Sequence, residues 1–240
     1  MGAYGLQATA SAGTTATSTT SLTPDASALT GLVGAPPGLP AKDRMGPSAA
    51  ETERLVDLIG KAKKTPAEKR AIVQAVFDRI ERRIEELKLE EARTHDSQIT
   101  DKRKALEALV RNLNTLDFKE DPFGFSDSWA YHSKLWGTNV IYLSEDFFRG
   151  LVAPSGDDQA DMLDVWLGER AATLAHEYEH TNQWIPREKP AYAQTKRMLE
   201  IINEPAIESI NSRRAANKLD NYPDSGLMKE STTRLESWWP

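Results

Sequence analysis

The pentapeptide His-Glu-Tyr-Glu-His at residues 176–180 constrains the fold of this chain more than any other segment. In an α-helix, residues four apart lie one turn from each other on the same face, so the two imidazoles meet if the segment is helical. Residues 171–175, which precede it, are small or apolar, as expected of a helix that passes through a hydrophobic core. The sequence therefore predicts a buried helix that brings two histidines together.

Residues 176–180 also fit the HExxH pattern, in which two histidines hold one metal ion beside a glutamate. His176 and His180 offer imidazole nitrogens, which zinc accepts as ligands. Glu177 could take a proton from water that the metal acidifies. The chain has no cysteine and only four histidines, so any metal must be held by histidines and carboxylates. We expect a zinc site with Glu177 as its base; the alternative is two ordinary histidines near a glutamate-rich helix end.

A catalytic zinc site needs a third protein ligand, and four glutamates downstream of the motif compete for that position. Glu188 follows in an expected turn. The other three, Glu200, Glu204 and Glu208, lie on one stripe of the next helical region. The pair Asn203-Glu204, with an acid four residues later, is similar to the Asn-Glu-x-x-x-acid pattern of thermolysin-like enzymes. The spacing predicts a carboxylate ligand without selecting one.

Four sequence features follow one another between Asn139 and Asn211. They are an Ile-Tyr-Leu-x-x-x-Phe-Phe segment at 141–148, the HExxH motif, Tyr192, and Pro205 followed six residues later by asparagine. In order and approximate spacing, this stretch resembles the deuterolysin and peptidyl-lysine metalloendopeptidase group, the aspzincins. The resemblance implies a zincin-like fold and zinc-dependent hydrolysis of peptide bonds. It also implies that the Tyr192 hydroxyl helps to hold the oxyanion of the tetrahedral intermediate.

The chain departs from that family at one position that matters. Where the family has its metal-binding aspartate, three residues before the tyrosine, this chain has Lys189, and an ammonium group cannot bind zinc. The neighbouring acid is Glu188, whose extra methylene group could compensate for a shift of one residue. We therefore expect Glu188 as the third ligand, with Glu204 as the alternative. The glycine that follows the tyrosine in the family is Ala193 here.

Residues 1–50 are rich in Ala, Thr, Gly, Ser and Pro and carry few charges. Such a segment buries too little apolar surface to offset its conformational entropy, so we expect a disordered tail. It has neither the basic start nor the apolar run of a conventional signal peptide. Its composition is similar to the leaders of translocated bacterial effectors, and also to plain linkers. We expect secretion or translocation by another route, and otherwise a cytoplasmic protein.

Two helices are predicted for residues 51–116. Thr65, Pro66 and Glu68 form a capping box with proline at the first helical position. Apolar residues then recur at steps of three and four over 72–87, and the charged residues of 79–86 on the other face are expected to be solvated. A second apolar stripe after Thr100 predicts a helix that packs antiparallel against the first.

Strands are expected from Phe118 onward, where glycine and proline separate segments rich in aromatic and branched residues. Residues 129–132 and 138–143 should form an antiparallel hairpin within a small mixed or antiparallel sheet. We expect a substrate to extend along 138–143 and to bond its main chain. Residues 51–240 are thus predicted to form an α+β, zincin-like metallopeptidase domain after a helical pair.

Charge and hydropathy exclude other classes of protein. The net charge of -6 provides no field for collecting phosphate groups, which argues against general nucleic-acid binding. No apolar run is long enough to cross a bilayer. We therefore expect a zinc-dependent endopeptidase that acts on a protein or peptide, and as a biological role a bacterial effector or toxin. The alternative is a non-catalytic helical interaction protein with an incidental or structural metal site.

Overall fold

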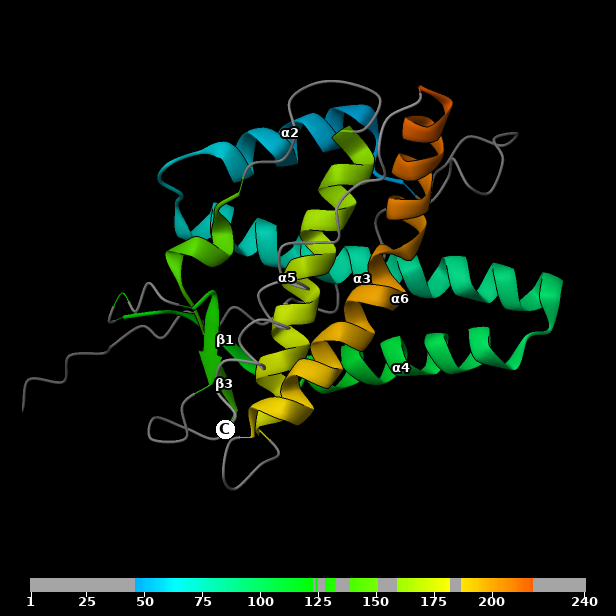
Figure 1. The fold of residues 1–240 in the computed structure, drawn as a ribbon. Coiled ribbons are helices and arrows are strands. Elements are labelled where there is room, and N and C mark those ends of the chain that lie inside the picture. Colours follow the sequence, from blue (N-terminus) through cyan, green and yellow to red (C-terminus); the bar gives the residue numbers. More distant parts are fainter. Residues whose placement is uncertain are drawn as a thin grey trace, which may run out of the picture.

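The computed structural model describes residues 46–122, 124, 128–132, 139–150, 159–181 and 187–217. These residues form five α-helices, one short 3-10 helix and a three-stranded sheet (Figure 1). The predicted α+β class is confirmed. Of the predicted tail, residues 1–50, the part up to position 45 lies outside the described residues. The last two residues of that tail are helical, because α2 spans Ala49–Gly60. None of the helices in the described ranges has the length and apolar character needed to cross a membrane.

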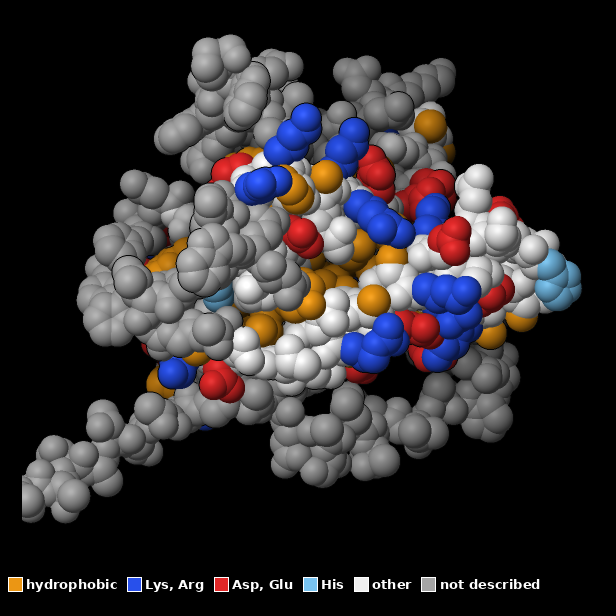
Figure 2. All heavy atoms as spheres, turned by 90° about the horizontal axis from the view of Figure 1, so that it is seen from below, with side chains coloured by type: hydrophobic (Ala, Val, Ile, Leu, Met, Phe, Trp, Pro, Cys, Tyr) orange, Lys and Arg blue, Asp and Glu red, His pale blue; other side chains and the backbone are white. Residues whose placement is uncertain are grey.

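Helices α3 (Pro66–Thr94) and α4 (Ser97–Leu113) form the predicted antiparallel pair (Figure 1). The predicted capping box opens α3: the Thr65 side chain accepts from the Glu68 N–H, and the Glu68 carboxylate accepts from the Thr65 N–H. The two helices share a buried apolar seam that includes Ile80, Leu87, Leu106, Leu109 and Leu113. On the face shown in Figure 2, basic and acidic side chains are interleaved along this pair.

The expectation that the charged face of α3 is solvated is wrong at two positions. Arg79 and Arg83 are 1% and 5% exposed, and they bond the backbone of helix α6 (Glu188–Ala216). Arg83 Nε donates to the Ile201 carbonyl at 2.9 Å, and Arg79 Nη2 donates to the Ile202 carbonyl. Pro205 lies inside α6 and has no N–H, so the Ile201 carbonyl has lost its helical donor. The arginines are buried because α6 offers them acceptors.

The sheet has the order β1-β3-β2, with β1 at Asp117–Glu120, β2 at Ala130–His132 and β3 at Val140–Leu143. Strands β2 and β3 pair antiparallel, as predicted, whereas β1 pairs parallel to β3. The sheet is therefore mixed. Strand β3 lies between two partners, so its main chain is not open to a substrate. The expectation of a substrate along residues 138–143 is wrong, and the edges of the sheet are β1 and β2.

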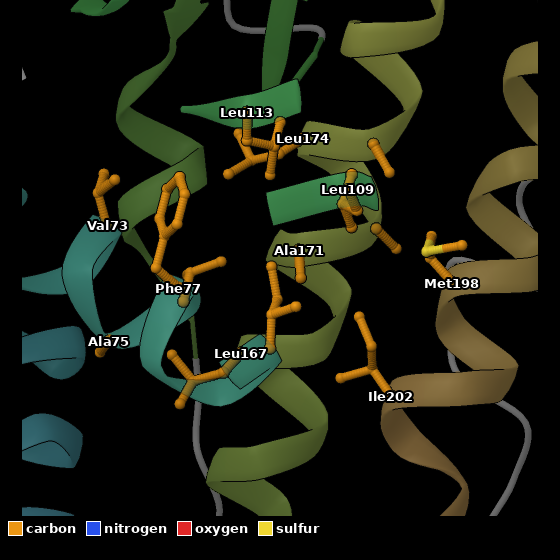
Figure 3. Packing of buried hydrophobic residues seen from close by; sticks show 14 of the residues in the cluster. Val73, Ala75, Phe77, Leu109, Leu113, Leu167, Ala171, Leu174, Met198 and Ile202 are labelled. Atoms are coloured by element: carbon orange, nitrogen blue, oxygen red, sulfur yellow. The ribbon is translucent and has the colours of Figure 1, made fainter. Parts of the chain in front are cut away.

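Helix α5 (Gln159–Thr181) runs through the centre of the molecule (Figure 1). Figure 3 shows Leu167, Ala171 and Leu174 of α5 among side chains from three other helices. Those neighbours are Val73 and Phe77 of α3, Leu109 and Leu113 of α4, and Met198 and Ile202 of α6. The predicted helix through the core is confirmed. It places the HExxH segment at the last turns of the most enclosed helix.

The crossing of α5 and α6 leaves no room at Gly168. A Cβ atom there would lie 1.8 Å from Asn203 Oδ1 and 3.0 Å from Ile202 Cγ2. Asn203 is 1% exposed, and its amide donates to the Val165 carbonyl of α5 at 3.3 Å. The two helices can approach closely only because position 168 has no side chain.

Replacing Gly168 with alanine should lower the free energy of unfolding by about 1 to 3 kcal/mol, because the added methyl group overpacks this crossing. Urea unfolding followed by circular dichroism measures the change. The matched control is Gly60→Ala, at the end of α2, where an added Cβ has no neighbour within 4 Å. Combining Gly168→Ala with Asn203→Ala should recover part of the loss. Equal stability of Gly168→Ala and Gly60→Ala would contradict this account.

Candidate metal centre

The last turns of α5 bring the two histidines of the motif together. His176 and His180 lie one helical turn apart, and their Nε2 atoms are 3.2 Å from each other. The ring planes meet almost edge to face, at 80°. His180 is 7% exposed, so little water surrounds it. The predicted convergence of both imidazoles on one face of a buried helix is confirmed.

Helix α6 brings Glu188 to the same point. Its Oε2 lies 3.4 Å from His176 Nε2, and its Oε1 lies 3.6 Å from His180 Nε2. The donor atoms of these three residues all lie within 4.8 Å of one another. We expected Glu188 in a turn, but it is the first residue of α6.

The other carboxylates lie elsewhere. Glu204, the alternative third ligand, accepts from Lys102 Nζ at 2.7 Å and lies 3.7 Å from Arg83 Nη2. Among the described residues, the group that could hold an ion contains neither Glu204 nor Glu200 nor Glu208. The geometry therefore supports Glu188 and gives no support to Glu204, because the bend and length of α6 place Glu204 against α3 and α4.

The side chains of His176, His180 and Glu188 lie close enough together to share one ion. Ligand atoms about 2.0 to 2.1 Å from a tetrahedral zinc ion lie about 3.3 Å from one another. The two Nε2 atoms here are 3.2 Å apart, and each lies near a different oxygen of Glu188, at 3.4 Å for His176 and 3.6 Å for His180. One donor atom from each residue lies within 4.8 Å of the other two. Two imidazole nitrogens and one carboxylate also form a donor set that zinc accepts in catalytic sites, with one position left for water or substrate. The residues fit zinc in chemistry, and the two imidazole nitrogens have the separation that a tetrahedral ion requires.

The same three side chains polarise one another. Hydrogen bonds with His176 and His180 hold the pKa of Glu188 well below its usual range. The bond with Glu188 raises the pKa of His180. The carboxylate is thus ionised at neutral pH, and the 61% exposure of its side chain also favours the charged form. An ionised carboxylate beside two imidazoles provides the negative charge that a divalent cation needs.

Glu177 lies next to the group of His176, His180 and Glu188 but is not one of its proposed metal ligands. Its carboxylate is buried, with 8% of the residue exposed, and Oε2 accepts from the backbone N–H of His132 at 3.0 Å. Burial raises the pKa of Glu177 to about 7. A pKa near neutrality suits a group that first accepts a proton and then returns it. The contact with His132, at the end of β2, was not predicted, because it involves the main chain and no side-chain pattern marks it.

Two further residues of α6 face His176. Glu188, Tyr192 and Thr195 recur at steps of four and three, so they share one side of the helix. The Tyr192 ring lies 4.9 Å from the His176 ring at 64°, and Thr195 Oγ1 lies 3.1 Å from His176 Nδ1. The structure thus brings Tyr192 to the site, as expected. Thr195 was missed, because a threonine inside a helix has no sequence signature of its own.

Glu188→Ala should weaken zinc binding by more than about 100-fold, since the loss of a direct ligand exceeds the 10- to 100-fold typical of residues behind the ligands. Glu204→Ala is the matched control from the same helix and should bind zinc like the wild type. Competition with a chromogenic chelator gives both dissociation constants. If Glu204→Ala loses the metal and Glu188→Ala keeps it, the third ligand is assigned wrongly.

Comparison with models of known protein families, with curated proteins and with solved structures finds no match. The resemblance to the aspzincins stays a prediction from the residues between Asn139 and Asn211.

Proposed function

We propose that the chain is a zinc-dependent endopeptidase with a zincin-like arrangement of helix, sheet edge and metal centre. The observation that carries this proposal is the convergence of His176, His180 and Glu188, whose donor atoms lie within 4.8 Å of one another, with the buried Glu177 carboxylate beside them. The donor group alone would suit a structural metal as well. A neighbouring acid with a pKa near neutrality is what hydrolysis needs in addition.

Each residue has a distinct task in the proposed reaction. His176, His180 and Glu188 would hold zinc, which when bound polarises a peptide carbonyl and acidifies water. Glu177 would take the proton of the attacking water and pass it to the leaving amine. The His132 N–H, 3.0 Å from Oε2, orients the Glu177 carboxylate for that transfer. Tyr192, whose ring lies against His176, would donate its hydroxyl hydrogen to the developing oxyanion.

The position of β2 at an edge of the sheet supports the proposal of a peptide substrate. Ser144 N–H donates to the Trp129 carbonyl at 3.0 Å, so Trp129 bonds toward β3. Bonding direction alternates along an antiparallel pair, which points the backbone groups of Ala130 and His132 away from β3. The His132 N–H on this side already reaches Glu177. An extended peptide that pairs with β2 would therefore lie next to the proposed base.

The biological role that we propose is an effector or toxin acting on proteins of a reducing cytosol. A chain without cysteine needs no disulfide and is unaffected by reducing conditions. The substrate would be a protein or peptide segment that can become extended. This part of the proposal rests on composition and on the resemblance described above.

A non-catalytic interaction protein is the second candidate. The observation that favours it is the α3–α4 pair, whose shared end at residues 94–97 extends past helices α5 and α6 (Figure 1). Charged pairs such as Arg103 with Glu91 and Glu107, each at 2.7 Å, cover part of its surface. In that case the metal group would be structural, and Glu177 could be replaced without consequence for function.

Glu177→Gln should lower the rate of peptide hydrolysis by about 100- to 10,000-fold, the usual contribution of a general base. Its zinc content and melting temperature should stay close to those of the wild type, because Glu177 is not a ligand. Mass spectrometry of a digested library of unstructured peptides measures cleavage, with chelator-treated wild type as the blank. If zinc-loaded wild type cleaves no peptide of the library, the interaction protein is the better assignment.

A further inference from the structure

Helix α6 makes a second contact with His176, on the ring nitrogen opposite the one near Glu188. His176 Nδ1 lies 3.1 Å from Thr195 Oγ1. Thr195 is 4% exposed, and its hydroxyl donates to the Ala191 carbonyl at 2.9 Å. A hydroxyl has one hydrogen and can accept through its lone pairs. While that hydrogen is directed to Ala191, Oγ1 can only accept a hydrogen bond from His176.

This orientation decides which nitrogen of the imidazole is free. A neutral imidazole carries one hydrogen, so an N–H at Nδ1 leaves a lone pair on Nε2. Nε2 is the atom that lies 3.2 Å from His180 Nε2 and 3.4 Å from Glu188 Oε2. The opposite tautomer would place a hydrogen among these donor atoms. A cation could then not bind His176 until that hydrogen moved.

We propose that Thr195 is a positioning residue of the metal centre. Its hydroxyl, directed by the Ala191 carbonyl, holds His176 in the tautomer that presents Nε2 to a divalent cation. The Tyr192 ring, 4.9 Å from the imidazole, limits rotation of the ring from another side. The proposal rests on the metal centre proposed above and does not depend on which reaction the centre performs.

A threonine of the neighbouring helix α5 serves as a matched control for a purely structural role of Thr195. Threonine hydroxyls inside helices commonly bond the carbonyl four residues earlier. Thr173 of α5 does so with the Glu169 carbonyl at 3.0 Å, as Thr195 does with Ala191. Among the described residues, the Thr173 hydroxyl makes no hydrogen bond with a proposed metal ligand. Removing each hydroxyl in turn separates loss of the helical bond from loss of the contact with His176.

The first test compares zinc dissociation constants of the full chain, measured by competition with a chromogenic chelator. Thr195→Val removes the hydroxyl and keeps the shape, and it should weaken zinc binding about 10- to 100-fold, as expected for a residue that orients a ligand. Thr195→Ser restores the hydroxyl and should bind zinc nearly as the wild type does. Thr173→Val should also match the wild type.

The second test needs no variant and therefore does not depend on the folding of Thr195→Val. Two-bond proton–nitrogen correlation spectra of the zinc-free wild type, at a pH where the ring is neutral, should show the His176 hydrogen on Nδ1. A hydrogen on Nε2, or a Thr195→Val protein that binds zinc as tightly as wild type, overturns the proposal. His176→Ala is measured in parallel. If Thr195→Val and His176→Ala both retain zinc, the proposed metal centre itself is wrong. If Thr195→Val retains zinc and His176→Ala loses it, the metal centre stands and only the role of Thr195 is wrong.

Discussion

Two guanidinium groups of helix α3 hold helix α6 at its bend. Pro205 withholds the N–H that the Ile201 carbonyl would otherwise accept, and Arg83 replaces it, while Arg79 bonds the next carbonyl. A buried carbonyl without a donor would cost about 1 to 3 kcal/mol. Helix α6 changes direction near its middle (Figure 1). The residues of α6 that reach the metal centre, Glu188, Tyr192 and Thr195, all precede this change of direction. Their approach to α5 therefore depends on the two arginine contacts, which lie more than one helical turn further along α6.

The metal centre lies between two helix ends of opposite polarity. Helix α5 ends at Thr181, just after its histidines, and helix α6 begins at Glu188. The carboxyl end of a helix carries partial negative charge, which favours a nearby cation, and the amino end favours a carboxylate. Both helix dipoles therefore favour the charges that the centre would hold. The close crossing at Gly168 keeps these two ends in register, because the helices are packed together along their length.

The sequence could predict what is encoded within a few residues. The helix around 176–180 and the capping box at Thr65 follow from local spacing, and so does the hairpin of β2 and β3. Contacts between distant segments could not be predicted in the same way. The parallel pairing of β1, the burial of Arg79 and the contact of Thr195 with His176 each depend on a partner far away in sequence. Glu188 was expected for its carboxylate, but its place at a helix start depends on where α6 begins.

The paired helices α3 and α4 differ from the rest of the molecule in how they are supported. Near the turn at 94–97, where His95 adopts a left-handed backbone conformation with φ of 54°, the two helices pack mainly on each other. Toward the sheet, α3 also contacts α5 and α6. Local opening in proteins begins where tertiary support is least. Amide hydrogens near residues 90–98 should therefore exchange with solvent well before those of α5, so the tip of the pair and the metal centre would behave as separate cooperative units.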